Sequence, residues 1–138
     1  MLRIHHEDTK TRSTDEALEQ LASQVVDAAF KVHTALGPGL LESVYEVCLA
    51  HELHRRGIAF ERQLSMPVHY EGFNLDAGLR LDLVIAGRIV VEIKAVEVLL
   101  PVHKAQLLTY LKLSGHRLGF LINFNVPTLK EGLKRIIL

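Results

Sequence analysis

The chain has 138 residues, a length that suits one domain with its own hydrophobic core. Hydrophobic residues make up 49% of the sequence, which excludes a largely disordered protein, and the formal net charge is zero. A neutral chain has no overall attraction to nucleic acid, so any such binding must come from a local patch. The single cysteine, Cys48, excludes an internal disulfide framework. Without an apolar signal segment or a membrane-spanning apolar run, the sequence predicts a soluble cytoplasmic protein.

The first part of the chain is predicted to be helical. Residues 1–14 are polar and lack hydrophobic periodicity, so we expect a flexible N-terminal arm, followed by a single domain over 15–138. A capping-box pattern begins at Ser13, and apolar residues then recur with helical spacing until the break at Gly37. A second helix is expected over about 40–56.

Three extended segments are expected next. Residues 58–70 have the pattern of a strand, in which Pro67 indicates an edge position or a bulge. Segments 79–85 and 88–96 alternate with a period of two, and their fully apolar sets occupy odd positions. If these segments form a hairpin with one shared core face, the connecting loop needs an odd number of residues. A three-residue loop that contains Gly87 satisfies this condition.

This register brings three charged residues together. Asp82, Glu92 and Lys94 fall on the face opposite the apolar one. A charge in a buried strand is costly unless a partner, a metal or exposure to a cleft offsets the cost. Carboxylates on rigid strands suit Mg²⁺ or Mn²⁺, and phosphodiester cleavage needs such a metal to activate water. Glu92 can therefore hold a metal while Lys94 orients water; the alternative is a cross-strand ion pair on an exposed sheet face.

The last part of the chain completes a mixed α/β pattern. A third helix is expected over 102–114, ended by Gly115, and 116–124 has the nearly continuous apolar character of a buried strand. The tail 128–138 is predicted to be a short amphipathic element that begins as a helix. The order is then α-α-β-β-β-α-β-α, and the helical crossover makes 88–96 and 116–124 parallel.

Two further pairs of polar side chains have helical spacing. Glu42 and Tyr45 are three residues apart at the start of the second helix, so they are expected to point the same way. A glutamate there is also favourable to the helix dipole, which on its own is the favoured explanation. Gln106 and Tyr110 are four apart and could line a cleft, where they would hold a phosphate or a lysine. Taken alone, a half-buried Gln–Tyr pair is again the simpler interpretation.

The chain resembles a small bacterial family known by its GxxExxY motif in three runs: VHTALGPGLLESVYEVCLAHEL, LRLDLVIAGRIVVEIKAVE and HKAQLLTYLKLSGHRLGFLINF. That family is grouped with the PD-(D/E)XK nuclease superfamily. The resemblance covers about residues 20–137 and implies a restriction-endonuclease-like core, a mixed β-sheet flanked by helices. One position departs from the superfamily pattern, because Leu81 stands where the motif has proline.

The resemblance also implies roles for particular residues. Glu42, Asp82 and Glu92, with the Ile93 carbonyl, would hold one or two Mg²⁺ or Mn²⁺ ions, and Lys94 would position the attacking water. The Q-x-x-x-Y pattern on the third helix is similar to that of the recombination-exonuclease branch and would support the lysine or the substrate backbone. The six side chains expected to carry the chemistry are Glu42, Asp82, Glu92, Lys94, Gln106 and Tyr110.

We therefore expect a metal-dependent phosphodiesterase that acts on DNA, with RNA as the second choice of substrate. The main alternative is a non-catalytic nucleic-acid-binding or protein-interaction module that retains a nuclease-like fold. A third alternative, a purely structural ion pair on a sheet face, predicts that Asp82→Ala is silent or mildly destabilising. No membrane partner is expected. The sequence leaves the oligomeric state open, with a homodimer as the candidate assembly.

Overall fold

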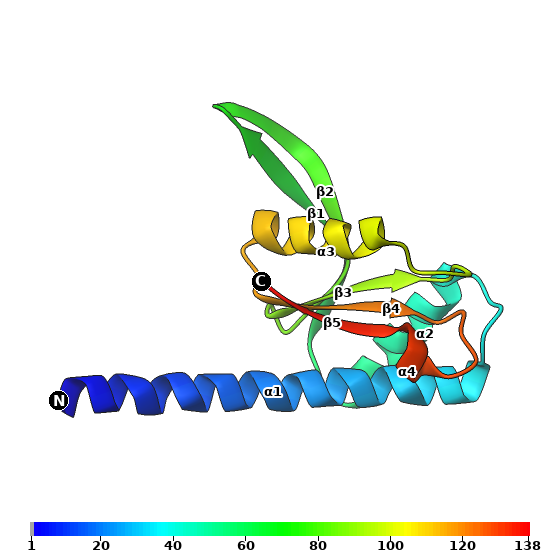
Figure 1. Ribbon diagram of the computed structural model, residues 1–138, viewed down its shortest axis with the longest axis horizontal. Coiled ribbons are helices and arrows are strands. Elements are labelled where there is room, and N and C mark those ends of the chain that lie inside the picture. Colours follow the sequence, from blue (N-terminus) through cyan, green and yellow to red (C-terminus); the bar gives the residue numbers. More distant parts are fainter. Residues whose placement is uncertain (1) are drawn as a thin grey trace.

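The computed structural model describes the backbone of residues 2–138 and the side chains from residue 15 onward. Its elements, in chain order, are α1 Leu2–Leu36, α2 Glu42–Arg55, β1 Phe60–Tyr70, β2 Phe73–Ile85, β3 Ile89–Lys94, α3 Pro101–Ser114, β4 Leu118–Asn123, α4 Leu129–Gly132 and β5 Leu133–Ile137. The strands form one sheet in the order β1-β2-β3-β4-β5, antiparallel except for the parallel pair β3–β4. The expected mixed α/β fold is confirmed (Figure 1).

The sheet lies between two hydrophobic clusters. On one face, Leu83 and Val91 pack with buried residues of α1 and α2. On the other face, Val84 and Val90 pack with Leu107 and its neighbours on α3. Because helices cover both faces, every residue of β4 is buried, and this strand has a continuous apolar sequence rather than an alternating one.

The β2–β3 hairpin has the predicted loop. Ile85 pairs with Ile89, which leaves three residues in the loop, and Gly87 lies at its centre. Ala86 and Gly87 both have positive φ, 52° and 65°, so a glycine suits this turn. The crossover through α3 then returns the chain beside β3, and the predicted parallel pairing of β3 with β4 is confirmed.

The faces of the β1–β2 hairpin differ from the prediction. Leu83 and Ile85 belong to the cluster with α1 and α2, whereas Leu79 and Leu81 pack in the cluster with α3. The expectation that all four odd-numbered residues share one core face is therefore wrong. The hairpin changes face at Asp82, and its outer part projects beyond α3 (Figure 1).

The N-terminal helix is longer than the sequence pattern predicts. α1 begins at Leu2, so the capping-box pattern at Ser13 does not mark its start, and the chain between them contains no glycine or proline to end a helix. The side chains of residues 1–14 lie outside the described part, and the division of the chain after residue 14 stays a prediction. None of the described helices combines the length and the apolar character needed to cross a membrane.

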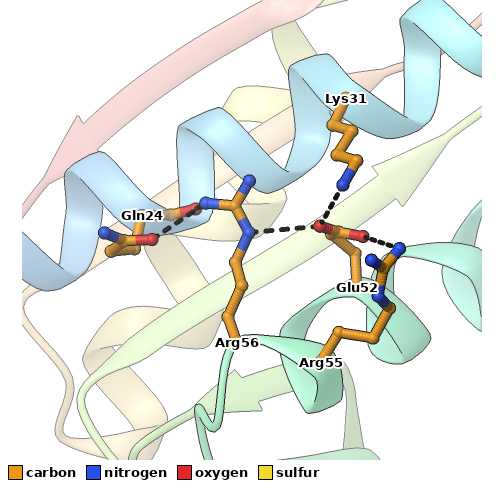
Figure 2. A network of polar contacts seen from close by, with 5 residues as sticks. All are labelled: Gln24, Lys31, Glu52, Arg55 and Arg56. Carbon is orange, nitrogen blue, oxygen red and sulfur yellow. Dashed lines mark hydrogen bonds and ion pairs between the residues drawn. The ribbon is translucent and has the colours of Figure 1, made fainter.

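A polar network joins α1 to α2 (Figure 2). Glu52, buried on α2, lies 3.2 Å from the Lys31 ammonium of α1 and 3.7 Å from the guanidinium of Arg55. Arg56 donates from Nε to the same carboxylate at 3.3 Å and from Nη1 to the side chain of Gln24 at 2.8 Å. These contacts tie the C-terminal end of α2 to α1.

The C-terminal tail is mostly strand rather than helix. The helix α4 is four residues long, and β5 then pairs antiparallel with β4, an element that is missing from the predicted order. Two facts explain the difference: β4 has an open edge whose backbone groups need partners, and β5 contains consecutive isoleucines. Gly132 makes the sharp junction possible, because a Cβ there would collide with the carbonyl oxygen of Asn123.

Candidate active site

Two acidic side chains lie together where the β2–β3 ladder stops. The last ladder pair is Leu83–Val91. Beyond it, the N–H of Asp82 donates to Glu92 Oε1 at 3.2 Å, and the N–H of Ile93 donates to Asp82 Oδ2 at 2.9 Å. Each carboxylate is thus held by a backbone amide of the opposite strand, and the two acids are fixed side by side.

The pKa values of this pair are raised. Burial raises the pKa of Glu92 to about 8, and the negative charge of Asp82 adds to the effect. Burial also raises the pKa of Asp82, although the hydrogen bond from Ile93 and the charge of Lys94 act to lower it. For both carboxyl groups the effect of burial outweighs the nearby positive charge of Lys94. A divalent cation bound by both carboxylates would add the positive charge that offsets their burial, and perturbed groups of this kind are typical of functional sites.

Lys94 is connected to α3 by a chain of hydrogen bonds. Its Nζ donates to Gln106 Oε1 at 3.2 Å, and Gln106 Nε2 donates to the Tyr110 hydroxyl at 2.9 Å. All three side chains are half-buried. An ammonium group has three N–H donors, so this contact directs Lys94 and leaves donors for a substrate. Of the two contacts expected for Gln106 and Tyr110, with the lysine or with a substrate backbone, the structure has the contact with the lysine.

Glu42 lies at the rim of the same site. It is the first residue of α2, and its side chain is exposed. Partial burial and then the negative charge of Asp82 raise the pKa of Glu42, while Lys94 acts to lower it, so these three groups are neighbours. Among the residues with described side chains, however, no three His, Cys, Asp or Glu residues form a group that could hold a metal. Glu42 therefore lies beside the Asp82–Glu92 pair rather than in one ligand cluster with it.

The tyrosine of the GxxExxY pattern has a structural role. Tyr45 is fully buried and stacks on Phe124, with ring centroids 4.6 Å apart. Its hydroxyl donates to the carbonyl of Gly37 at 2.7 Å and accepts from the N–H of Leu40 at 3.1 Å. Tyr45 therefore points into the core and not toward the site, contrary to the expectation that it points the same way as Glu42. It holds the turn from which α2 starts.

Two polar residues that the sequence patterns did not single out, Glu46 and Asn123, hold the elements next to the site in place. Glu46 is buried one turn after Glu42 and binds side chains of β1. Asn123 is buried at the end of β4 and fixes the loop after β3: it accepts from the Val96 N–H at 3.0 Å and donates to the Val96 carbonyl at 2.8 Å. Two signals in the sequence could have indicated these residues. Glu46 is a carboxylate within the apolar stripe of a helix, and Asn123 is an asparagine at the end of a buried strand.

A five-stranded mixed sheet with paired carboxylates and a tethered lysine at its centre is the arrangement of a nuclease-like domain. Residues 19–136 match the family model of the PD-(D/E)XK nuclease superfamily, and the chain belongs to this superfamily. Nucleases of the superfamily act on nucleic acids and generally use divalent metals. Comparisons with curated proteins and with solved structures produced no match.

Proposed function

We propose that this protein is a metal-dependent phosphodiesterase that cleaves DNA, with RNA as the second choice of substrate. The observation that carries the proposal is the pairing of the half-buried Asp82 with the buried Glu92, each held by the backbone of the opposite strand. A free Cys48 is in keeping with activity in the cytoplasm. The more specific assignment to the GxxExxY family is part of the same proposal.

The donor set fits a hard divalent cation, Mg²⁺ or Mn²⁺. Asp82 and Glu92 supply carboxylate oxygens, and the Ile93 carbonyl adds a backbone oxygen on the same strand. The negative charge of Asp82 acts on Glu42, and Glu42 would help to hold a second ion beside the pair. When bound, the cation supplies charge neutralisation at the phosphate and lowers the pKa of water.

The remaining residues orient the reacting groups. Lys94 directs its ammonium toward the attacking water and the developing negative charge on the phosphate oxygens. Gln106 accepts from Lys94 and so restrains the ammonium, and Tyr110 accepts from the Gln106 amide and restrains it in turn. The chain therefore places one fixed positive charge beside two fixed carboxylates, which suits cleavage of a phosphodiester.

Cleavage assays test this function directly. Wild-type protein is incubated with single-stranded DNA, duplex DNA and RNA in Mg²⁺, in Mn²⁺ and in a chelator. We expect metal-dependent cleavage that falls at least about 100-fold in Asp82→Asn and in Lys94→Met. Matched controls are Asp76→Asn, an exposed acid on the same strand, and Lys112→Met, an exposed lysine on α3. Wild-type protein that cleaves none of the substrates, or an Asp82→Asn variant that is fully active, contradicts the proposal.

A non-catalytic module with a nuclease-like fold is the second candidate. The observation in its favour is that the described acidic residues do not form a three-ligand metal group. Titration calorimetry with Mn²⁺ separates the two candidates. Binding that disappears in Asp82→Asn and Glu92→Gln supports the enzyme, and the absence of such binding supports the module.

A further inference from the structure

The buried carboxylate of Glu46, on α2, accepts hydrogen bonds from two residues of β1. Glu46 is 6% exposed and lies one turn after Glu42. Arg62 donates to Glu46 Oε2 from Nε at 3.2 Å and from Nη2 at 2.9 Å, and Gln63 Nε2 donates to Oε1 at 2.6 Å. A buried carboxylate needs partners for both oxygens. Glu46 obtains all of these hydrogen bonds from two consecutive residues of β1.

One of those two residues has an unusual backbone. Gln63 has a φ of 51°, in the left-handed region that residues with a side chain rarely adopt. Such a conformation persists only where the surroundings fix it, and it is frequent at functional sites. The short hydrogen bond to Glu46 is a contact that holds Gln63 in this state.

The left-handed residue lies opposite Asp82. The ladder pairs on either side of the interruption are Arg62–Leu83 and Leu64–Leu81. The register is the same on both sides of Gln63, so no residue is inserted there. A left-handed residue instead departs from the extended backbone and so redirects the strand locally. The hairpin changes its packing face at this point, and the backbone N–H of Asp82 donates to a carboxylate of the neighbouring strand.

We propose that Glu46 is a positioning residue for the metal site: by holding Gln63 in its left-handed conformation, it maintains the bend that sets Asp82 against Glu92. This role rests on the proposed function in one respect, that the Asp82–Glu92 pair binds a divalent cation. The competing explanation is an effect of charge through space, because the negative charge of Glu46 also acts to raise the pKa of Asp82 and of Glu42. A role through geometry and a role through charge predict different Mn²⁺ affinities for proteins substituted at residues 46 and 63.

Mn²⁺ affinity, measured by calorimetry on folded protein, distinguishes the two. Glu46→Leu removes both charge and acceptor, and we expect its Kd to rise about 10-fold or more. Glu46→Gln removes the charge but keeps an oxygen that accepts from Gln63, and we expect a Kd close to that of wild type. The matched control is Glu52→Leu, which breaks the other buried carboxylate network of α2 far from the site and should leave the Kd unchanged.

Substitutions at residue 63 test the mechanism itself. Glycine adopts a left-handed conformation without strain, so Gln63→Gly should keep the wild-type Kd and should restore most of the affinity lost in Glu46→Leu. Gln63→Val should weaken Mn²⁺ binding, because a β-branched residue resists this conformation. A residue that only stabilised the fold would not be made dispensable by a glycine at position 63. Circular dichroism and thermal unfolding confirm that each variant is folded.

Three results overturn the positioning role while the proposed function stands. The first result is that Glu46→Leu binds Mn²⁺ with the wild-type Kd. The second is that the Kd rises as much in Glu46→Gln as in Glu46→Leu, and that adding Gln63→Gly to Glu46→Leu does not restore the affinity. The third result applies if Glu46→Leu does not fold. In that case, equal Mn²⁺ Kd values for Gln63→Gly and Gln63→Val overturn the positioning role. Wild-type protein that binds no Mn²⁺ contradicts the proposed function, and the positioning role with it.

Discussion

Among individual residues, Glu92 has the clearest consequence for stability. Its pKa is raised to about 8 by burial and by the neighbouring charge of Asp82, so the folded protein keeps a proton that the unfolded chain releases near pH 4.5. A folded state that binds more protons than the unfolded state loses stability as the pH rises. The Asp82–Glu92 pair is therefore a local destabilising feature, and such features are frequent at functional sites.

We predict that the free energy of unfolding of the metal-free protein falls as the pH rises from about 4.5 to about 8. Glu92→Gln should remove part of this slope, because the amide does not titrate. Urea unfolding of both proteins at several pH values across this range, in the presence of a chelator, measures the difference. Identical slopes for the two proteins would contradict the raised pKa of Glu92.

The site residues differ in how far the sequence could place them. Alternation and the length of one loop, which are local rules, predicted that Asp82, Glu92 and Lys94 lie close together. The premise that residues 79–85 share one core face was nevertheless wrong, because the change of face at Asp82 is not visible in the alternation. The contact of Lys94 with Gln106 required a crossover helix, whose presence the pattern also indicated. The part played by Gln63 could not be foreseen, because its left-handed backbone depends on a carboxylate seventeen positions earlier in the chain.

Among the structural elements, the turn between α1 and α2 bears on the site through Glu42, which follows it. The hydroxyl of Tyr45 makes two hydrogen bonds to this turn, and the turn leads into Glu42 at the start of α2. The aromatic stack on Phe124 anchors the same helix to the end of β4. The glycine, glutamate and tyrosine of the motif thus form one structural unit, in which the tyrosine supports the glutamate.

Tyr45→Phe should lower the free energy of unfolding by about 1–2 kcal/mol, since it keeps the stack and removes two buried hydrogen bonds. We also expect weaker Mn²⁺ binding, because the turn that carries Glu42 is loosened. Urea unfolding and calorimetry provide the two measurements. Tyr70→Phe, at an exposed position on β1, is the control and should change neither quantity. Wild-type stability in Tyr45→Phe would show that these hydrogen bonds are not needed.

The network around Glu52 makes a separate prediction (Figure 2). Although burial acts to raise it, the pKa of Glu52 lies below its ordinary value because Lys31 and Arg56 hydrogen-bond to the carboxylate. A lowered carboxyl pKa stabilises the fold above pH 4.5, and this contribution is lost as the pH falls through the folded-state pKa. Glu52→Gln should therefore lower the midpoint temperature near neutral pH but change it less in acid. Equal losses at both pH values would exclude an ionic contribution.

At the scale of the whole molecule, the sequence predicted the class of fold and the central part of the sheet. The parallel pair β3–β4 followed from a crossover rule, and the three-residue loop followed from hydrophobic alternation. β5 was missed because its pairing is decided by the open edge of β4, a long-range effect that the pattern of the tail does not contain. The helical start of α1 was missed because a polar segment without breakers carries no hydrophobic period.

A crystal of the wild-type protein soaked in Mn²⁺ tests the central claim most directly. Anomalous scattering identifies the metal independently of any substrate. We predict an anomalous peak in contact with the carboxylates of both Asp82 and Glu92, and its loss in crystals of Asp82→Asn. An absence of any peak there at saturating Mn²⁺, or an equal peak in the Asp82→Asn variant, would contradict a metal-dependent nuclease site in this protein.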